Sequence, residues 1–209
     1  GSAPRRGCDG GLNARPRAAD AMTTWRKEVG HAGRLVMVGF GCIGQGVLPL
    51  LLRHIDLRPT QIVILDPDPT GQSVADEFEV PKIDVALTAE NLRTVLAPLL
   101  KPGDFLLNLS VDVSSVALID LCQQVGALYL DTCIEPWAGG YVDAAVGLER
   151  RTNQALREDA LALRRLDRAS PTAVLTHGAN PGLVSHFVRQ ALLDLAGSSG
   201  AWCERPGSA

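Results

Sequence analysis

Residues 34–46, RLVMVGFGCIGQG, decide the fold of this chain. An apolar run leads into Gly39, Gly41 and Gly44 with the spacing G-x-G-x-x-G, and an apolar segment follows at 47–52. A strand, this glycine turn and a helix are together typical of a dinucleotide site. The first glycine permits the tight turn, the second lets the backbone approach a pyrophosphate, and the third lets the helix pack closely against the strand. The free N–H groups and positive dipole end at the helix N-terminus favour bound phosphates.

A glycine turn of this kind is common, so the next predicted strand matters. That strand, QIVIL at 61–65, ends at Asp66. In dinucleotide sites the acid that binds the adenosine ribose lies about 20 residues beyond the turn, at such a strand end. A carboxylate there repels a 2′-phosphate, which favours NAD over NADP; the alternative is an acid that caps the turn before Pro67. The cofactor contacts that we predict in these two segments are Gly39, Gly41, Cys42, Ile43, Gly44 and Asp66.

Composition excludes several classes of protein. The chain has 209 residues, of which 46% are hydrophobic and 21% charged, as in a globular protein with a sizeable core. Its net charge of −3 gives no electrostatic reason to expect nucleic acid or a membrane surface as a partner. No apolar run is long enough to span a bilayer, and no secretory signal is recognisable. The five scattered cysteines lack a C-x-x-C motif, so we expect reduced thiols, no metal site and a cytoplasmic location.

Apolar segments alternate between strand-like and helix-like patterns along the middle of the chain. Strands are predicted at 34–39, 61–66, 82–86, 104–109, 127–131 and 172–176, and helices at 43–54, 72–78, 88–101, 116–125, 153–165 and 183–195. Thr88 is expected to cap the third helix and Asn180 the last, with Pro181 in its first turn. Mostly continuous apolar strands between helices predict an α/β fold, a Rossmann-type doubly wound parallel sheet.

The two ends of the chain lack this alternation. Residues 1–32 are rich in Gly, Ala, Arg and Pro, and we expect a disordered leader or tag there. Residues 33–150 are predicted to form the NAD-binding domain. A helix, a strand and a helix at 151–196 are expected to complete it and to lead toward a second, substrate-binding domain that is largely missing. Residues 197–209 are expected to be an unpatterned tail.

The unusual polar clusters all follow predicted strands. Ligands of open parallel sheets lie beyond the carboxyl ends of the strands, so this shared placement predicts one site. Asn108 and Ser110 could touch the ribose or the nicotinamide, or cap the next helix, and Thr132 begins a further polar loop after the fifth strand. Asp112 could face the same site or be that helix cap, and the residues alone leave both roles open.

Three residues in the later loops are candidates for chemistry. Glu135 precedes Pro136 and Trp137, and a carboxylate beside an aromatic face suits an organic cation. The alternative is a solvated acid beside a tryptophan that packs in the core. His177 could act as a general base, although a lone histidine before a glycine is more often structural. Asn180 is by its local sequence a helix cap.

Four long segments resemble bacterial homospermidine synthases, whose fold is related to that of saccharopine dehydrogenase. They are VGFGCIGQGVLPLLLRH, GDFLLNLSVDVSS, LYLDTCIEPW and THGANPGLVSHFV. The resemblance covers about residues 33–196 and concerns the N-terminal portion of that family. Members of the family are longer than this chain, so the resemblance implies the NAD half of an enzyme with part of the wall of its substrate site.

The resemblance implies a transferase reaction that recycles its cofactor. Such enzymes make sym-homospermidine from two putrescines, or from putrescine and spermidine, through imine intermediates. NAD accepts a hydride from an amine carbon and returns it to the imine that forms when the second amine condenses. The resemblance also implies that Glu135, Asn180 and Asp112 are active-site residues and that full-length members form homodimers. The chain alone is then expected to bind NAD but to turn over putrescine poorly or not at all.

Two other functions stay open. A saccharopine or carboxynorspermidine dehydrogenase-like oxidoreductase would act on substrates that carry carboxylates, which call for arginines at the site. The E-P-W and G-A-N-P-G loops contain none. A non-catalytic NAD-binding module would bind the cofactor without turnover. A comparison of NAD affinity with putrescine turnover separates such a module from the enzyme.

Overall fold

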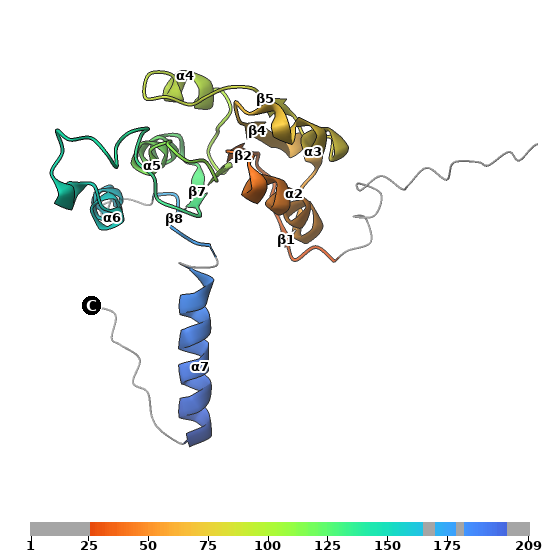
Figure 1. Cartoon of the computed structure of the whole chain (residues 1–209). Helices are drawn as coiled ribbons and strands as arrows, with labels where there is room; N and C mark the ends of the chain where they lie inside the picture. The colour runs from red at the N-terminus through yellow and green to blue at the C-terminus, as the bar shows by residue number, and fades with distance from the viewer. Residues whose placement is uncertain (1–25, 165–169, 179–181, 200–209) are drawn as a thin grey trace, which may run out of the picture.

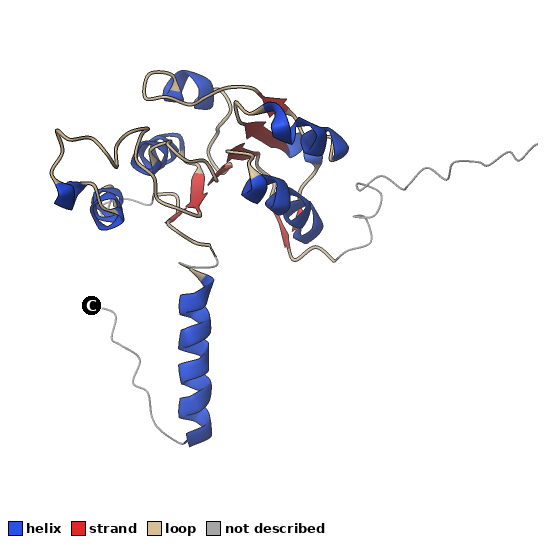
Figure 2. Cartoon of the chain, viewed as in Figure 1, coloured by secondary structure: helices blue, strands red, loops and turns tan. Residues whose placement is uncertain are grey.

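The body of the molecule is a parallel β-sheet. The computed structural model describes residues 26–164, 170–178 and 182–199 (Figure 1, Figure 2). The strands of the six-stranded sheet are β2 (Leu35–Val38), β4 (Ile62–Leu65), β5 (Lys82–Ile83), β6 (Phe105–Asn108), β7 (Leu128–Asp131) and β8 (Ala173–Val174). Their spatial order is β5-β4-β2-β6-β7-β8, and every neighbouring pair is parallel. The sheet therefore starts in its middle and grows outward in both directions, which confirms the predicted doubly wound fold.

Helices cover both faces of this sheet (Figure 1). One face carries α2 (Cys42–His54) and α3 (Gln72–Glu77), and the other carries α4 (Leu92–Leu96), α5 (Ser115–Val125) and α6 (Asn153–Ala162). Successive side chains of a strand point to opposite faces. Met37 of β2 therefore packs with the α2 layer, and Val38 packs with the α5 layer. Burial on both faces is the reason that the strands are continuously apolar.

Several elements are shorter than predicted, among them α4, β5 and β8. The helix expected from Thr88 begins at Leu92, because the Thr88 N–H donates to Asn91 Oδ1 (2.8 Å) and residues 89–91 form a turn. Asn91, not Thr88, precedes the first helical residue. β5 and β8 have two residues each. They are the edge strands of the sheet, so each is hydrogen-bonded on one side only.

The first described strand lies inside the predicted leader. β1 (Val29–Gly30) pairs in parallel with β3 (Ile55–Asp56), beside the end of α2. The Glu28 N–H donates to His54 O (2.7 Å), which adds a further bond to this short pair. Residues 1–25 lie outside the described part of the chain.

The last helix, α7 (Leu183–Ser199), stands clear of the sheet in Figure 1. It continues three residues beyond the predicted boundary at residue 196. Its large apolar side chains are exposed, among them Val184, Phe187, Val188, Leu192 and Leu195. Asn180 and Pro181, predicted to start this helix, lie outside the described residues. In the part of the chain that the structure describes, no helix is long and apolar enough to cross a membrane.

Candidate functional site

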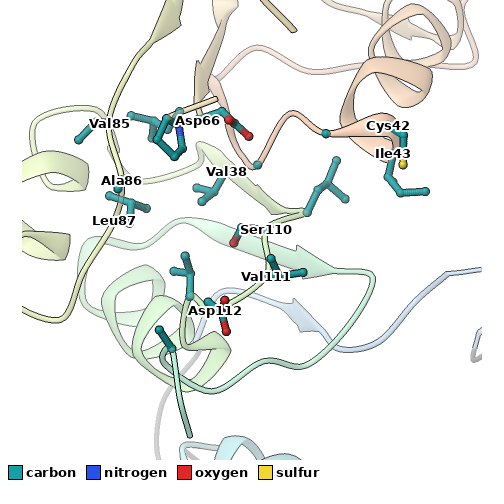
Figure 3. A pocket seen from close by; sticks show the side chains of 17 residues that line it. Val38, Cys42, Ile43, Asp66, Val85, Ala86, Leu87, Ser110, Val111 and Asp112 are labelled. Carbon is teal, nitrogen blue, oxygen red and sulfur yellow. The ribbon is translucent and has the colours of Figure 1, made fainter. Parts of the chain in front are cut away.

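A cavity of about 510 Å³ lies where β2, β4 and β6 end, beside the first turn of α2 (Figure 3). The predicted cofactor contacts that line it are Gly39, Gly41, Cys42, Ile43, Asp66 and Ser110. Asp112 lines it too, on the opposite side from Asp66 in Figure 3. Three strand ends thus meet at the point where the strand order reverses, which is where open α/β sheets bind their ligands.

The three glycines of the turn lack a side chain for different reasons. Gly39 has a φ of +89°, and a Cβ there would lie 2.6 Å from Ser110 N. A Cβ on Gly44, which does not line the cavity, would lie 2.9 Å from Gly39 O, so this glycine lets α2 pack against the turn. A Cβ on Gly41 would meet nothing within 4 Å. The protein itself requires Gly39 and Gly44, whereas the space beside Gly41 is open to a ligand that approaches the backbone.

Asp66 holds the glycine turn against the end of β4. Its Oδ2 accepts from Phe40 N (2.5 Å) and its Oδ1 from Asp68 N (2.7 Å). The acid therefore caps the strand end, yet each carboxylate oxygen can still accept a bond from a hydroxyl. Lys82 Nζ donates to Asp66 O (3.0 Å) and pairs with Asp84. Among the described residues that line the cavity there is no Lys or Arg, so no cationic side chain there would neutralise a 2′-phosphate.

The loop after β6 presents Ser110 and Asp112 to the cavity by different means. Asn108 is buried and does not line the cavity; its Oδ1 accepts from Ser110 Oγ (2.6 Å) and Ser110 N (3.2 Å), which orients the serine. Asp112 is exposed and has a φ of +62°. Ser114, whose Oγ accepts from Ala117 N (3.3 Å), is the cap of α5. The interpretation of Asp112 as that cap is therefore wrong, and its carboxylate stays at the cavity.

Glu135 is nearly buried beside the start of α5. Its N–H donates to Ser115 Oγ (3.0 Å), and its carbonyl accepts from Ser115 N (2.9 Å). The Cys133 thiol donates to Glu135 Oε1 (3.3 Å). Burial, and then this bond and the charge of Glu135, raise the pKa of Cys133 to about 11, so the thiol stays protonated at neutral pH. Trp137 packs against the core on the α5 side, which supports a packing role for its ring.

Tyr141 is a neighbour of this site that sequence patterns did not identify. Its hydroxyl lies 3.0 Å from Ile134 O. Burial raises the pKa of Tyr141 to about 12, and the negative charges of Glu135 and Asp112 add to the rise. The tyrosine is therefore within electrostatic reach of both acids, which belong to separate loops. The sequence marks Tyr141 only weakly, because it is simply one of two tyrosines in the chain and directly follows two glycines.

Glu135 does not line the glycine-turn cavity, and two further predicted residues line a different one. Thr132 and His177 line a second, mostly apolar groove of about 490 Å³, which α2, β6 and β7 also line. The His177 ring stacks on that of His186 in α7, with centroids 5.4 Å apart. Asn180 lies outside the described residues, so its place is not part of this geometry. Within the described ranges, no group of three or more His, Cys, Asp and Glu side chains could hold a metal ion.

Comparison with known proteins relates this geometry to a family. A family model described as Saccharopine dehydrogenase NADP binding domain matches residues 35–174. Homospermidine synthase of Blastochloris viridis is 45% identical over 188 residues, which are 88% of this chain and 39% of that protein. Homospermidine synthase of Mesorhizobium japonicum is 44% identical over 177 residues, 83% of this chain and 36% of that protein.

A solved structure shows the same arrangement of the backbone. The crystal structure of homospermidine synthase from Legionella pneumophila in complex with NAD superimposes with a TM-score of 0.75 at 41% sequence identity. The match covers 86% of this chain and 37% of that one. The chain therefore spans less than two fifths of the length of the relatives it matches.

We predict that the same added methyl group changes the free energy of unfolding differently at different glycines of the turn. Gly39→Ala should destabilise the protein by about 1–3 kcal/mol, because strain at a positive φ combines with a clash at Ser110 N. Gly41→Ala should change the free energy of unfolding by less than about 0.5 kcal/mol. Gly46→Ala is the matched control in α2, since a Cβ there also meets nothing within 4 Å. Urea unfolding without nucleotide measures the stability of all three variants. A large loss of stability in Gly41→Ala would contradict the open space beside Gly41.

The reactivity of Cys133 reports on its contact with Glu135. Glu135→Gln removes the negative charge that helps to raise the pKa of the thiol, so the pKa should fall. The rate of alkylation by iodoacetamide should then rise, since each unit of pKa changes the thiolate fraction about tenfold. Mass spectrometry of the alkylated peptide gives the rate, with exposed Cys42 as the internal reference. An unchanged ratio of the two rates would show that the carboxylate does not influence the thiol.

Proposed function

Since the chain belongs to the saccharopine dehydrogenase NADP-binding-domain family, we propose that it is the NAD-binding N-terminal part of a homospermidine synthase. Relatives with that name are 44% and 45% identical to it, and a third was solved in complex with NAD. Because the chain spans 36–39% of these proteins, the reaction of the whole enzyme is part of the proposal.

The glycine-turn cavity fits NAD. The open backbone at Gly41 and the N-terminus of α2 suit the pyrophosphate, and Asp66 suits the hydroxyls of the adenosine ribose. The described lining has no basic side chain for a 2′-phosphate, which favours NAD even though the family model is named for NADP. When bound, NAD supplies an acceptor for a hydride from an amine carbon and returns that hydride later in the cycle.

Two acids on neighbouring loops, of which Asp112 lines the cavity, suit diamine substrates. The carboxylates of Asp112 and Glu135 lie near Tyr141 on neighbouring loops, and such charges attract the ammonium groups of putrescine or spermidine. In this proposal Glu135 exchanges a proton with an amine, and the Cys133 thiol donates to its Oε1. The catalytic role of Asn180 rests on the resemblance of the H-G-A-N-P-G loop alone.

The observation that carries the proposal is that one cavity is lined both by an open glycine backbone at Gly41 and by an acid, Asp66. A saccharopine or carboxynorspermidine dehydrogenase-like oxidoreductase would need a counter-charge for its carboxylate substrates, and the described lining offers none. A non-catalytic NAD-binding module would share the cofactor site and differ in turnover. With free thiols at its described cysteines, the enzyme would work in the cytoplasm, as a homodimer in full-length form.

Isothermal titration calorimetry of the purified chain tests the cofactor. NAD should bind at least about tenfold more tightly than NADP, because Asp66 repels the 2′-phosphate. Gly41→Ala should weaken NAD binding by about tenfold or more, since the methyl group occupies the approach to the pyrophosphate. Gly46→Ala should bind as the unchanged protein does. Equal affinity for NAD and NADP, or full affinity in Gly41→Ala, would contradict the proposed site.

A chimera tests the reaction. The matching segment of the Blastochloris viridis homospermidine synthase is replaced by residues 33–196 of this chain, and product from putrescine and NAD is measured by mass spectrometry. We expect homospermidine from the chimera and little or none from the chain alone. Glu135→Gln in the chimera should lower kcat by about 100-fold or more while NAD still binds. A chimera that binds NAD but forms no product would favour the non-catalytic module.

A further inference from the structure

Four buried polar side chains lie between β6, β7 and the start of α5. They are Asn108, Ser115, Tyr129 and Asp131, each at most 1% exposed, and they are called the polar cluster below. Burial of polar groups is costly unless each finds a hydrogen-bond partner. The partners of these four side chains therefore indicate what the cluster is for.

The hydroxyl of Tyr129 joins two strands through this cluster. It donates to Asp131 Oδ2 (2.8 Å) and accepts from Asn108 Nδ2 (3.3 Å). Because the hydroxyl has one proton and the carboxylate only accepts, these directions are fixed. With its Nδ2 turned to Tyr129, Asn108 must turn its Oδ1 away, to where it accepts from Ser110. The tyrosine hydroxyl thus sets the orientation of the amide that holds Ser110 at the cavity.

Asp131 holds the loop that follows β8. Its Oδ1 accepts from Thr176 N (2.5 Å), and its carbonyl accepts from His177 N (2.9 Å). Thr176 has a φ of +49°, a conformation that is unfavourable for a β-branched residue and persists only where the surroundings impose it. The two bonds from Asp131 impose it. They fix the chain just before Gly178, at the start of the H-G-A-N-P-G loop.

Ser115 ties a third loop to the same cluster. Its Oγ and N–H bond reciprocally to the backbone of Glu135 (3.0 and 2.9 Å). Its hydroxyl also interacts with Tyr129 and Asp131. The four side chains therefore contact, directly or through one another, the loops that follow β6 and β7 and the start of the loop that follows β8.

We propose that the polar cluster is a positioning unit, which sets these three loops relative to one another. Tyr129 and Asp131 are its positioning residues, and neither lines the glycine-turn cavity. The inference rests on the proposed function for the assignment of active-site residues to these loops. The coupling between the loops does not depend on that function. Substitution of one member of the cluster should loosen loops that follow different strands at the same time. If the members acted as independent caps, each substitution would loosen only one loop.

Tyr129→Phe tests the coupling, because it removes one oxygen and leaves the ring in the core. In the full chain without ligand, amide hydrogen exchange at Ser110 N and Thr176 N should become about tenfold faster at both sites. Ile64→Val is the control, since it removes one carbon from a fully buried side chain on the other face of the sheet. In this variant the two amides should change no more than those in the rest of the sheet.

NAD affinity is the second readout, and a loss of global stability alone would not change it in folded protein. Tyr129→Phe should bind NAD about three- to tenfold more weakly, because Ser110 lines the cavity, and Ile64→Val should bind normally. Unchanged exchange at both amides, or a change at only one, would overturn the positioning unit even if NAD binds. Coupled exchange in a chain that binds no NAD would overturn the proposed function and support the unit. If Tyr129→Phe does not fold, Asp131→Asn, which keeps the side-chain size, is judged by the same two amides.

Discussion

The structure depends on the close contact between Gly39 and the backbone of residues 109–110. A Cβ on Gly39 would lie 2.6 Å from Ser110 N, and the Gly39 N–H donates to Leu65 O (2.9 Å). The ends of three adjacent strands are thereby held at one point, in the middle of the sheet where the strand order reverses. Any side chain at this position would push them apart. The cavity is the space that opens just beyond this contact, and the acids and backbone amides around it follow from the strands that end there.

Local sequence patterns identified the features that a single segment can specify. The spacing of Gly39, Gly41 and Gly44 between an apolar strand and an apolar helix predicted the turn and the parallel sheet, because strands buried on both faces are continuously apolar. Asp66 was identifiable since its distance along the chain is set by one helix and one returning strand. The long motifs around Asp112 and Glu135 located their loops but not their contacts.

Other features depend on contacts between distant segments, which no local pattern encodes. Asp131 bonds to Thr176, 45 residues away, and the strained turn at Thr176 has no meaning without that bond. Asn108 and Ser110 end the same strand, yet the Asn108 side chain is buried and donates to Tyr129, whereas Ser110 lines the cavity. The edge strands were predicted too long because only the finished sheet shows which strands lack a second neighbour.

Backbone amide NMR during titration with NAD tests most directly whether the glycine-turn cavity is the cofactor site. We predict saturable shifts at Gly41, Cys42 and Ser110 and none at Leu128 in the apolar groove. The first three residues line the cavity, and Leu128 does not. Shifts confined to the apolar groove would contradict this assignment. Unchanged amide shifts in the glycine turn at NAD concentrations that saturate binding would also contradict it.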